Sequence, residues 1–103
     1  MMWRVCYSDN AKQDLKGIYT YIKKVLCVPD TAKNQAKRIK NAADSLIHMP
    51  MRHRLLDYEP WRSRGVRAMV VDGYIVIYHP NERSHIVSII RILHGRRDIK
   101  SHL

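Results

Sequence analysis

Apolar residues recur every three or four positions along two stretches of the chain, which is the period of an amphipathic helix. The first stretch follows Ser8 or Asp9, either a good N-cap, and ends near Pro29, because a residue before proline disfavours helical backbone. The second stretch follows another capping pair, Asp30 or Thr31. The apolar positions are Ala11, Leu15, Ile18, Ile22 and Leu26, then Ala36, Ile39, Ala43, Leu46 and Ile47. Opposite the second set lie Lys33, Lys37 and Lys40. We therefore expect a helical hairpin with a basic outer side.

The remaining apolar runs have the alternating pattern of strands. Residues 3–7 form one run, and two more flank Asp72-Gly73, a pair that accepts the positive φ angles of a tight type I′ hairpin turn. A last strand is expected over residues 85–93. Residues 48–65 have two prolines and no sustained period, which predicts a long connection. The expected order is β-α-α-β-β-β, in a single domain over residues 1–103.

A two-residue turn fixes which hairpin residues face each other. The turn places Val71 opposite Tyr74, Met69 opposite Val76 and Arg67 opposite Tyr78, all on one side of the sheet. The other side is wholly apolar, so we expect it to lie under the helices. Its residues are Val66, Ala68, Val70, Ile75 and Ile77. On this interpretation the side with Arg67 and Tyr78 faces outward, and Arg91 of the last strand joins it because a charged residue is disfavoured in the core.

The charge of the chain narrows the possible partners. Lysine and arginine number 19 against 9 acidic residues, which gives a formal net charge of +10 and favours polyanionic partners. No apolar run is long enough to span a bilayer and no secretory leader is evident, so we expect a cytoplasmic protein without membrane contact. The two cysteines, Cys6 and Cys27, lack metal-site spacing and are expected to be reduced and mostly buried.

Four segments carry a family resemblance. They are "AKQDLKGIYTYI", "EPWRSRGVR", "DGYIVIYHPNE" and the ending "RILHGRRDI". In these segments the chain resembles toxins of the RelE/ParE superfamily, the toxic half of type II toxin–antitoxin modules, also called plasmid-stabilisation proteins. The ending is typical of the ParE-like branch. The resemblance implies an α+β fold in which a helical hairpin packs on a mainly antiparallel twisted sheet. It also implies a cognate antitoxin as partner, with an acidic or amphipathic segment that neutralises the toxin.

The resemblance implies two alternative mechanisms. RelE-like members cleave mRNA on the ribosome without a metal, whereas ParE-like members inhibit DNA gyrase by binding. Metal-free cleavage requires cations for the phosphate and groups that carry protons. The candidate catalytic residues are His94, Arg97, Arg67, Arg91 and Tyr78. The candidate substrate-binding residues are Arg62, Arg64, Arg96 and His79. No metal or other cofactor is expected.

Two positions depart from the RelE pattern. Ile75 replaces an arginine that follows glycine-tyrosine in those nucleases, and the ending at His102 and Leu103 lacks their catalytic tyrosine. Only Arg97 matches a RelE-type catalytic position. Ribosome-associated cleavage is placed first because the arginine, histidine and tyrosine set suits phosphate chemistry, and gyrase inhibition is the alternative.

Other interpretations stay open. Arg67 and Arg91 suit surface positions in which their stems cover apolar sheet or their charges pair with Asp98 and Glu59. A non-catalytic RNA-binding domain would use aromatic side chains as stacking platforms. Trp61 is one such side chain, but its place in the connection favours a role as an anchor that holds the connection on the fold.

Overall fold

A computed structural model of the chain describes residues 2–95 and 99–103. Its strands and helices are β1 (Arg4–Tyr7), α1 (Asp9–Thr20), α2 (Pro29–Asp44), β2 (Arg54–Leu55), β3 (Arg67–Val71), β4 (Tyr74–Asn81) and β5 (Ile86–His94). Shorter helical turns cover Tyr21–Val25, Ser45–Ile47, Pro50–Arg52 and Ile99–His102. The order confirms the α+β prediction, with the short strand β2 as an addition inside the long connection.

The two helices begin in different ways. The Ser8 side chain accepts a hydrogen bond from the backbone N–H of Ala11 at 3.0 Å, as expected of an N-cap. Helix α2 instead begins at Pro29, after an N-cap at Val28 that makes no side-chain bond. Backbone N–H groups in the first turn of any helix have no intrahelical acceptor, so a proline there loses no hydrogen bond. The expected caps at positions 30 and 31 are therefore wrong, and both residues lie inside the helix.

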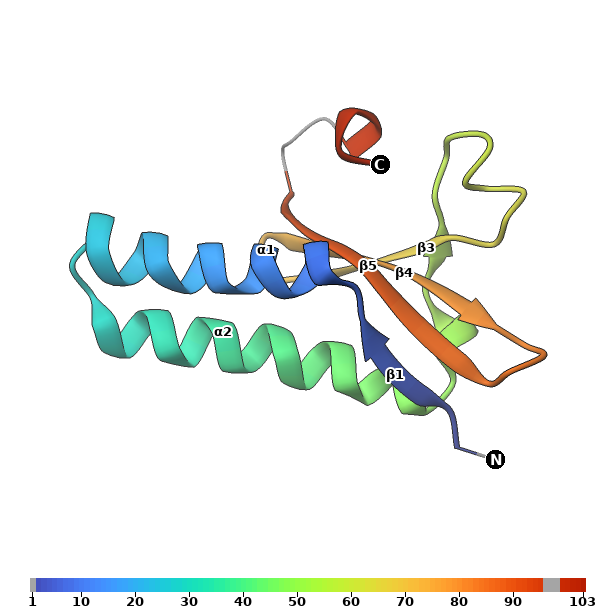
Figure 1. Ribbon diagram of the computed structural model, residues 1–103, viewed down its shortest axis with the longest axis horizontal. Coiled ribbons are helices and arrows are strands. Elements are labelled where there is room, and N and C mark those ends of the chain that lie inside the picture. Colours follow the sequence, from blue (N-terminus) through green and yellow to red (C-terminus); the bar gives the residue numbers. More distant parts are fainter. Residues whose placement is uncertain (1, 96–98) are drawn as a thin grey trace.

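The strands form one five-stranded sheet in the order β1-β5-β4-β3-β2 (Figure 1). Strand β1 is parallel to β5, and the other neighbours are antiparallel. The predicted hairpin register is confirmed, with Val71 opposite Tyr74 and Arg67 opposite Tyr78. Asp72 and Gly73 both have positive φ angles, 51° and 84°, as the tight turn requires.

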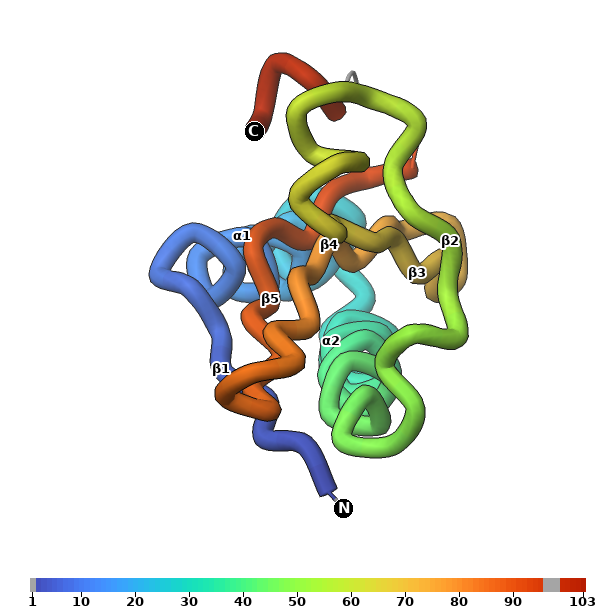
Figure 2. The backbone as a smooth tube through the Cα atoms, turned by 90° about the vertical axis from the view of Figure 1, so that its right-hand side faces the viewer, coloured from blue at the N-terminus to red at the C-terminus, as the bar shows by residue number. Residues whose placement is uncertain are grey.

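The predicted assignment of the two sides of the sheet is wrong. The helices cover the side that carries Met69, Val76 and Tyr78, and the core there includes Ile39 and Leu46 from the helical layer. Tyr78 is fully buried, with an exposed fraction of 0%. Figure 2 shows α2 on one side of the sheet, with the connection between β2 and β3 and the C-terminal turn on the other.

The opposite side is also covered, by irregular chain. Leu56, Val66, Ile77 and Leu93 form a second buried cluster, and Trp61 packs against it, which confirms the anchor role of the tryptophan. Partly buried neighbours of this cluster are Ala68, Ile75, Ile90, Ile99 and Leu103. The apolar residues expected under the helices therefore lie under the connection, except for Val70, which is 73% exposed. Because both sides are covered, the alternating pattern could not identify the helix side.

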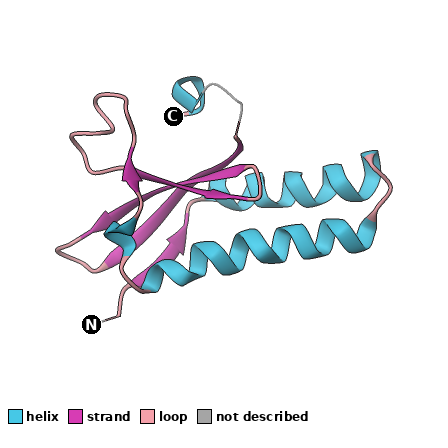
Figure 3. Ribbon diagram, turned by 180° about the vertical axis from the view of Figure 1, so that it is seen from behind, coloured by secondary structure: helices cyan, strands magenta, loops and turns pink. Residues whose placement is uncertain are grey.

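The joined ends of the helices extend beyond the sheet (Figure 3). A π-helical turn (Tyr21–Val25) continues α1 toward this tip, and Tyr21, Val25, Leu26 and Val28 are exposed there. Cys27 lies at the tip with a φ angle of 56°. Cys27 and Cys6 are free and exposed, so the expectation of buried thiols is wrong.

Candidate functional site

Tyr78 and Arg67 hold the end of the hairpin against the connection between α2 and β2. The Tyr78 hydroxyl donates to the carbonyl oxygen of Pro50 at 2.6 Å, and burial raises the pKa of Tyr78 to about 12. Arg67 donates from Nη1 to the carbonyl oxygens of Met51 at 3.2 Å and His53 at 2.6 Å. The expectation that both residues face outward is wrong, because the turn at Pro50–Arg52 covers this end of the helix side.

Arg91 lies apart from this pair. The β4–β5 register shifts between Ile77 and Tyr78, which pair with Arg91 and Ile89 and leave Ile90 of β5 as the extra residue. Arg91 therefore lies opposite Ile77, and its side chain does not join Tyr78 as expected. Its guanidinium instead donates to the carboxylate of Asp14 in α1, from Nε at 2.7 Å and from Nη2 at 2.9 Å. Hydrogen bonding to Asp14 raises the pKa of Arg91. Among the described residues the acidic partner of Arg91 is therefore Asp14 and not Glu59, and Asp98, the other suggested partner, lies outside the described residues.

His94 ends β5 at the opposite end of the hairpin. Its ring is exposed and meets the Tyr74 ring edge-on, with centroids 5.6 Å apart. The Gly95 N–H donates to the carbonyl oxygen of Gly73 at 2.8 Å, and a Cβ on residue 95 would lie 2.7 Å from that oxygen. Glycine alone permits this approach. Arg96 and Arg97, expected to complete the site beside His94, lie outside the described residues.

Three of the predicted residues do come together. Arg64, Arg67 and His79 line a cavity of about 340 Å³, which we call the basic notch. The notch arises because β3 begins at Arg67 while β4 runs on to Asn81, so the last residues of β4 have no β3 partner. Its other lining residues are Met51, Ser63, Gly65, Pro80, Asn81, Glu82 and Arg83.

One arginine of the notch was not predicted, and one predicted arginine lies outside the notch. Arg83 comes from the β4–β5 turn, and the only signal for it was its charge next to the "PNE" turn. Arg62, an expected substrate-binding residue, instead points to Asp57 with a separation of 3.6 Å. The notch therefore gathers arginines from three separate segments.

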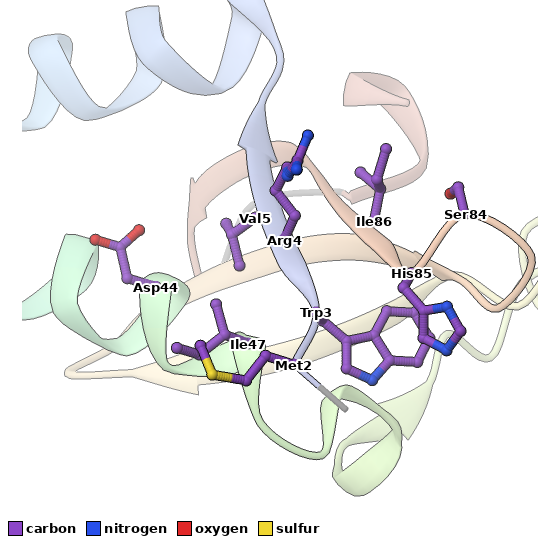
Figure 4. Close-up of a pocket in the computed structure, with 9 residues that line it drawn as sticks. All are labelled: Met2, Trp3, Arg4, Val5, Asp44, Ile47, Ser84, His85 and Ile86. Carbon is purple, nitrogen blue, oxygen red and sulfur yellow. The ribbon is translucent and has the colours of Figure 1, made fainter.

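A separate depression of about 650 Å³ lies at the start of β1. Figure 4 shows the Trp3 and His85 rings side by side, and their centroids are 4.9 Å apart. Its acidic residue, Asp44, is already bonded to the Tyr7 hydroxyl at 2.6 Å and to Lys40 at 2.8 Å. Burial, and then the bond to Asp44, raises the pKa of Tyr7. These contacts fix β1 to α2 and give the depression a structural explanation.

The described residues form neither a cluster of metal-ligating side chains nor a helix able to span a bilayer. No three histidine, cysteine or acidic side chains within residues 2–95 and 99–103 approach closely enough to hold a metal ion. None of the helices in the same part of the chain combines the length and apolar character that a bilayer-spanning segment needs.

The family model for the ParE toxin of the type II toxin–antitoxin system parDE matches residues 5–99. This match covers nearly the whole chain, including both α-helices and, apart from Arg4 at the start of β1, all five strands. The chain belongs to the ParE toxin family. No curated protein matches the sequence significantly.

Solved structures of similar toxins share the fold of this ParE-family toxin. A chain of the chromosomal ParDE system from P. aeruginosa superposes with a TM-score of 0.73 at 21% identity, covering 90% of this chain and 96% of that one. A chain of the RelBE2 toxin–antitoxin complex from Mycobacterium tuberculosis gives 0.64 at 20% identity, covering 91% and 99%. A chain of the E. coli RelBE complex gives 0.61 at 10% identity, covering 92% and 99%. At these identities the likeness shows the shared fold.

A further groove of the toxin runs over its helices. Its floor is apolar, and its edges carry lysines that reach over aromatic rings. We call it the lysine-rimmed groove; it is lined by Tyr7, Lys12, Leu15, Lys16, Tyr19, Ala36 and Lys40. The Lys40 ammonium lies 5.9 Å from the Tyr7 ring centroid, and that of Lys23 lies 5.5 Å from the Tyr19 centroid. Apolar floor and cationic edges suit an amphipathic acidic segment.

Proposed function

We propose that this toxin arrests bacterial growth by binding DNA gyrase. The sequence alone placed mRNA cleavage first, and two findings now support the other order. The matching family model is that of ParE toxins rather than RelE nucleases. Arg91, expected at the cleaved phosphate, is paired with the carboxylate of Asp14 at 2.7 Å.

The contact between Arg91 and Asp14 carries this argument. An arginine whose charge is balanced by a partly buried carboxylate is a poor stabiliser of a developing phosphate charge. Tyr78 is likewise unsuited to proton transfer at neutral pH, because its hydroxyl is buried and its pKa is raised to about 12. A protein that acts by binding needs neither group at its surface.

The test compares the two activities in purified systems. Toxin added to gyrase should stop supercoiling of relaxed plasmid, and the same toxin added to translating ribosomes should leave mRNA intact. If His94 transfers a proton in mRNA cleavage, His94→Ala would slow that reaction on the order of 10²–10⁴-fold. Discrete mRNA cuts that depend on His94, with supercoiling unaffected, would overturn the proposal.

We further propose that a cognate antitoxin covers the lysine-rimmed groove with an acidic, amphipathic segment. The +10 charge supports an acidic partner, and solved relatives come from toxin–antitoxin complexes. Lysines at the edge would speed association through long-range attraction, while the apolar floor would anchor the segment.

Paired substitutions test this contact. Lys12→Glu with Lys16→Glu should slow association with the purified antitoxin at least about tenfold at low salt, and the difference should shrink as salt rises. Lys24→Glu with Lys33→Glu is the matched control, since it changes the same charge away from the groove lining. Similar slowing by both pairs would mean that overall charge, rather than this groove, guides the antitoxin.

A further inference from the structure

The basic notch carries more positive charge than the surrounding chain neutralises. Three arginines line it, with Glu82 as its one carboxylate. Within residues 2–95 and 99–103 the ion pairs are Arg38–Asp72, Lys40–Asp44, Arg62–Asp57 and Arg91–Asp14. None of these pairs uses an arginine of the notch. Uncompensated guanidinium groups around one concavity attract an external anion.

Arg67 is a fixed donor in this cavity. Its Nη1 is held by the carbonyl oxygens of Met51 and His53, which leaves its charge unbalanced because a carbonyl oxygen carries no net charge. Its Nη2 makes no hydrogen bond to the described residues. This atom is also not fully buried. Nη2 therefore reaches solvent and keeps hydrogen-bonding capacity for a ligand, whereas Nε of the same guanidinium is buried without a partner. The two carbonyl oxygens already hold the group in place, so binding need not reorganise it.

Two backbone features shape the notch, the positive φ angle of Gly65 and the turn that carries Arg83. Gly65 has a φ angle of +82°, and a Cβ there would meet the His79 ring at 3.9 Å. The Asn81 side-chain oxygen accepts from the backbone N–H groups of Arg83 and Ser84 at 3.0 and 3.2 Å. These bonds fix the Arg83 backbone at the lining of the cavity.

We propose that the basic notch binds a phosphodiester group of double-stranded DNA. Guanidinium groups match the geometry of phosphate oxygens, and a chain of charge +10 gains further affinity from a polyanion by releasing its counterions. The choice of DNA over RNA rests on the proposed function, because gyrase acts on duplex DNA. The notch would then hold the toxin against DNA that gyrase has engaged.

The experiment compares two double variants that remove equal charge. Fluorescence anisotropy with a duplex of about 20 base pairs would measure the affinity of the full chain across a range of salt concentrations. Arg64→Gln with Arg83→Gln should weaken binding at least about tenfold and reduce the slope of log K against log salt by about 1–2. Lys33→Gln with Lys37→Gln, on the exposed side of α2, should weaken it less than about threefold. Circular dichroism checks that both variants fold.

Equal losses in the two variants would overturn the proposal, because they would show that DNA binds the basic surface without using the notch. Tighter binding of an RNA hairpin than of the duplex, lost in the notch variant, would overturn the choice of DNA. The supercoiling test with unmodified toxin checks the proposed function independently of these binding measurements. Failure to inhibit gyrase, with selective loss of DNA binding in the notch variant, would reject the proposed function while supporting the notch.

Discussion

Arg67 and Arg91 are both partly buried arginines of the same sheet, yet their surroundings differ in the kind of oxygen that they meet. Arg67 donates to two backbone carbonyl oxygens and keeps an uncompensated charge beside the basic notch. Arg91 donates through two nitrogens to the carboxylate of Asp14, and through Nη1 to the carbonyl oxygen of His102 at 2.9 Å. The charge of Arg67 therefore stays unbalanced, whereas the charge of Arg91 is neutralised by Asp14.

The difference separates an arginine whose charge is unbalanced from one whose charge is paired with a carboxylate. Asp14 also accepts the backbone N–H of Ile92 at 3.0 Å, and the Ser8 hydroxyl donates to the Ile90 carbonyl at 2.7 Å. Side chains from α1 and its N-cap therefore bond the backbone N–H and carbonyl groups of β5 beyond the point where β1 stops pairing with it. The contact between Arg91 and Asp14 therefore helps to cover the edge of β5 that β1 leaves unpaired. This role requires the Asp14 carboxylate to stay in place.

The largest effect is expected at Asp14. Asp14→Ala would leave Nε and Nη2 of Arg91 and the Ile92 N–H without their acceptor, and both partners of the pair are at most 20% exposed. The free energy of unfolding should fall by about 2–4 kcal/mol, measured by urea denaturation. Asp57→Ala, which removes the exposed 3.6 Å contact with Arg62, should change it by less than about 0.5 kcal/mol. Equal effects would mean that the Asp14 contact is as weak as a surface pair.

A somewhat smaller loss is expected at Gly95. Gly95→Ala places a Cβ 2.7 Å from the carbonyl oxygen of Gly73, so the end of β5 must move off the turn, at a cost of about 1–3 kcal/mol. Gly17→Ala is the matched control, because no atom lies within 4 Å of an added Cβ and alanine favours a helix by about 1 kcal/mol. Thermal unfolding should shift in opposite directions for the two variants. If Gly95→Ala were instead more stable than the parent, the turn at Gly73 would have to move away from residue 95 at little cost.

Much of the fold follows from local rules. The turn at Asp72 and Gly73 fixed the hairpin register because both residues tolerate positive φ. The sides of the sheet could not be assigned in the same way, since the connection anchored by Trp61 buries its own apolar cluster. The β-bulge at Ile90 of β5 then changed the side of the sheet on which the later β5 residues lie. A bulge has no reliable signature in one sequence.

The candidate site was predictable only as a set of residue types. Arg91 and Asp14 are separated by 77 positions, so no local pattern joins them. The basic notch depends on where β3 begins relative to β4, which places Arg64 and His79 near Arg83 of the next turn. Residue type indicated anion binding, whereas the position of each charge depended on long-range packing.

Tyr78 provides a test in which structural and catalytic roles give opposite results. Tyr78→Phe should lower the free energy of unfolding by about 1–2 kcal/mol, because the Pro50 carbonyl loses its donor. It should leave toxicity in growing cells unchanged. Loss of toxicity with unchanged stability would instead favour a catalytic hydroxyl. It would also weaken the contrast between the surroundings of Arg67 and those of Arg91.

The same hydroxyl predicts a loss of stability at alkaline pH. Burial raises the pKa of Tyr78 from its usual value of 10.0 to about 12, so the folded state holds the proton more tightly than the unfolded state. The contribution is complete below pH 10 and declines as pH rises toward 12. Urea midpoints of the parent chain should fall faster over this range than those of Tyr78→Phe. Parallel curves would contradict a buried, protonated hydroxyl.

The smallest effect is expected at Asp72, an exposed counterpart of the Asp14 pair. Hydrogen bonds from Arg38 at 2.7 Å and Gln35 at 3.2 Å lower the pKa of Asp72 below 3.8. The stabilisation is therefore present above that pH and is lost as pH falls through the lower folded-state pKa. Asp72→Asn keeps a residue that tolerates positive φ but removes the charge, so its urea midpoint should match the parent at strongly acidic pH and fall slightly below it near neutrality. Added salt should shrink this difference, because the pair is exposed, while the effect of Asp14→Ala should persist. A salt-resistant loss at Asp72 would show that the turn depends on its link to α2 as strongly as β5 depends on Asp14.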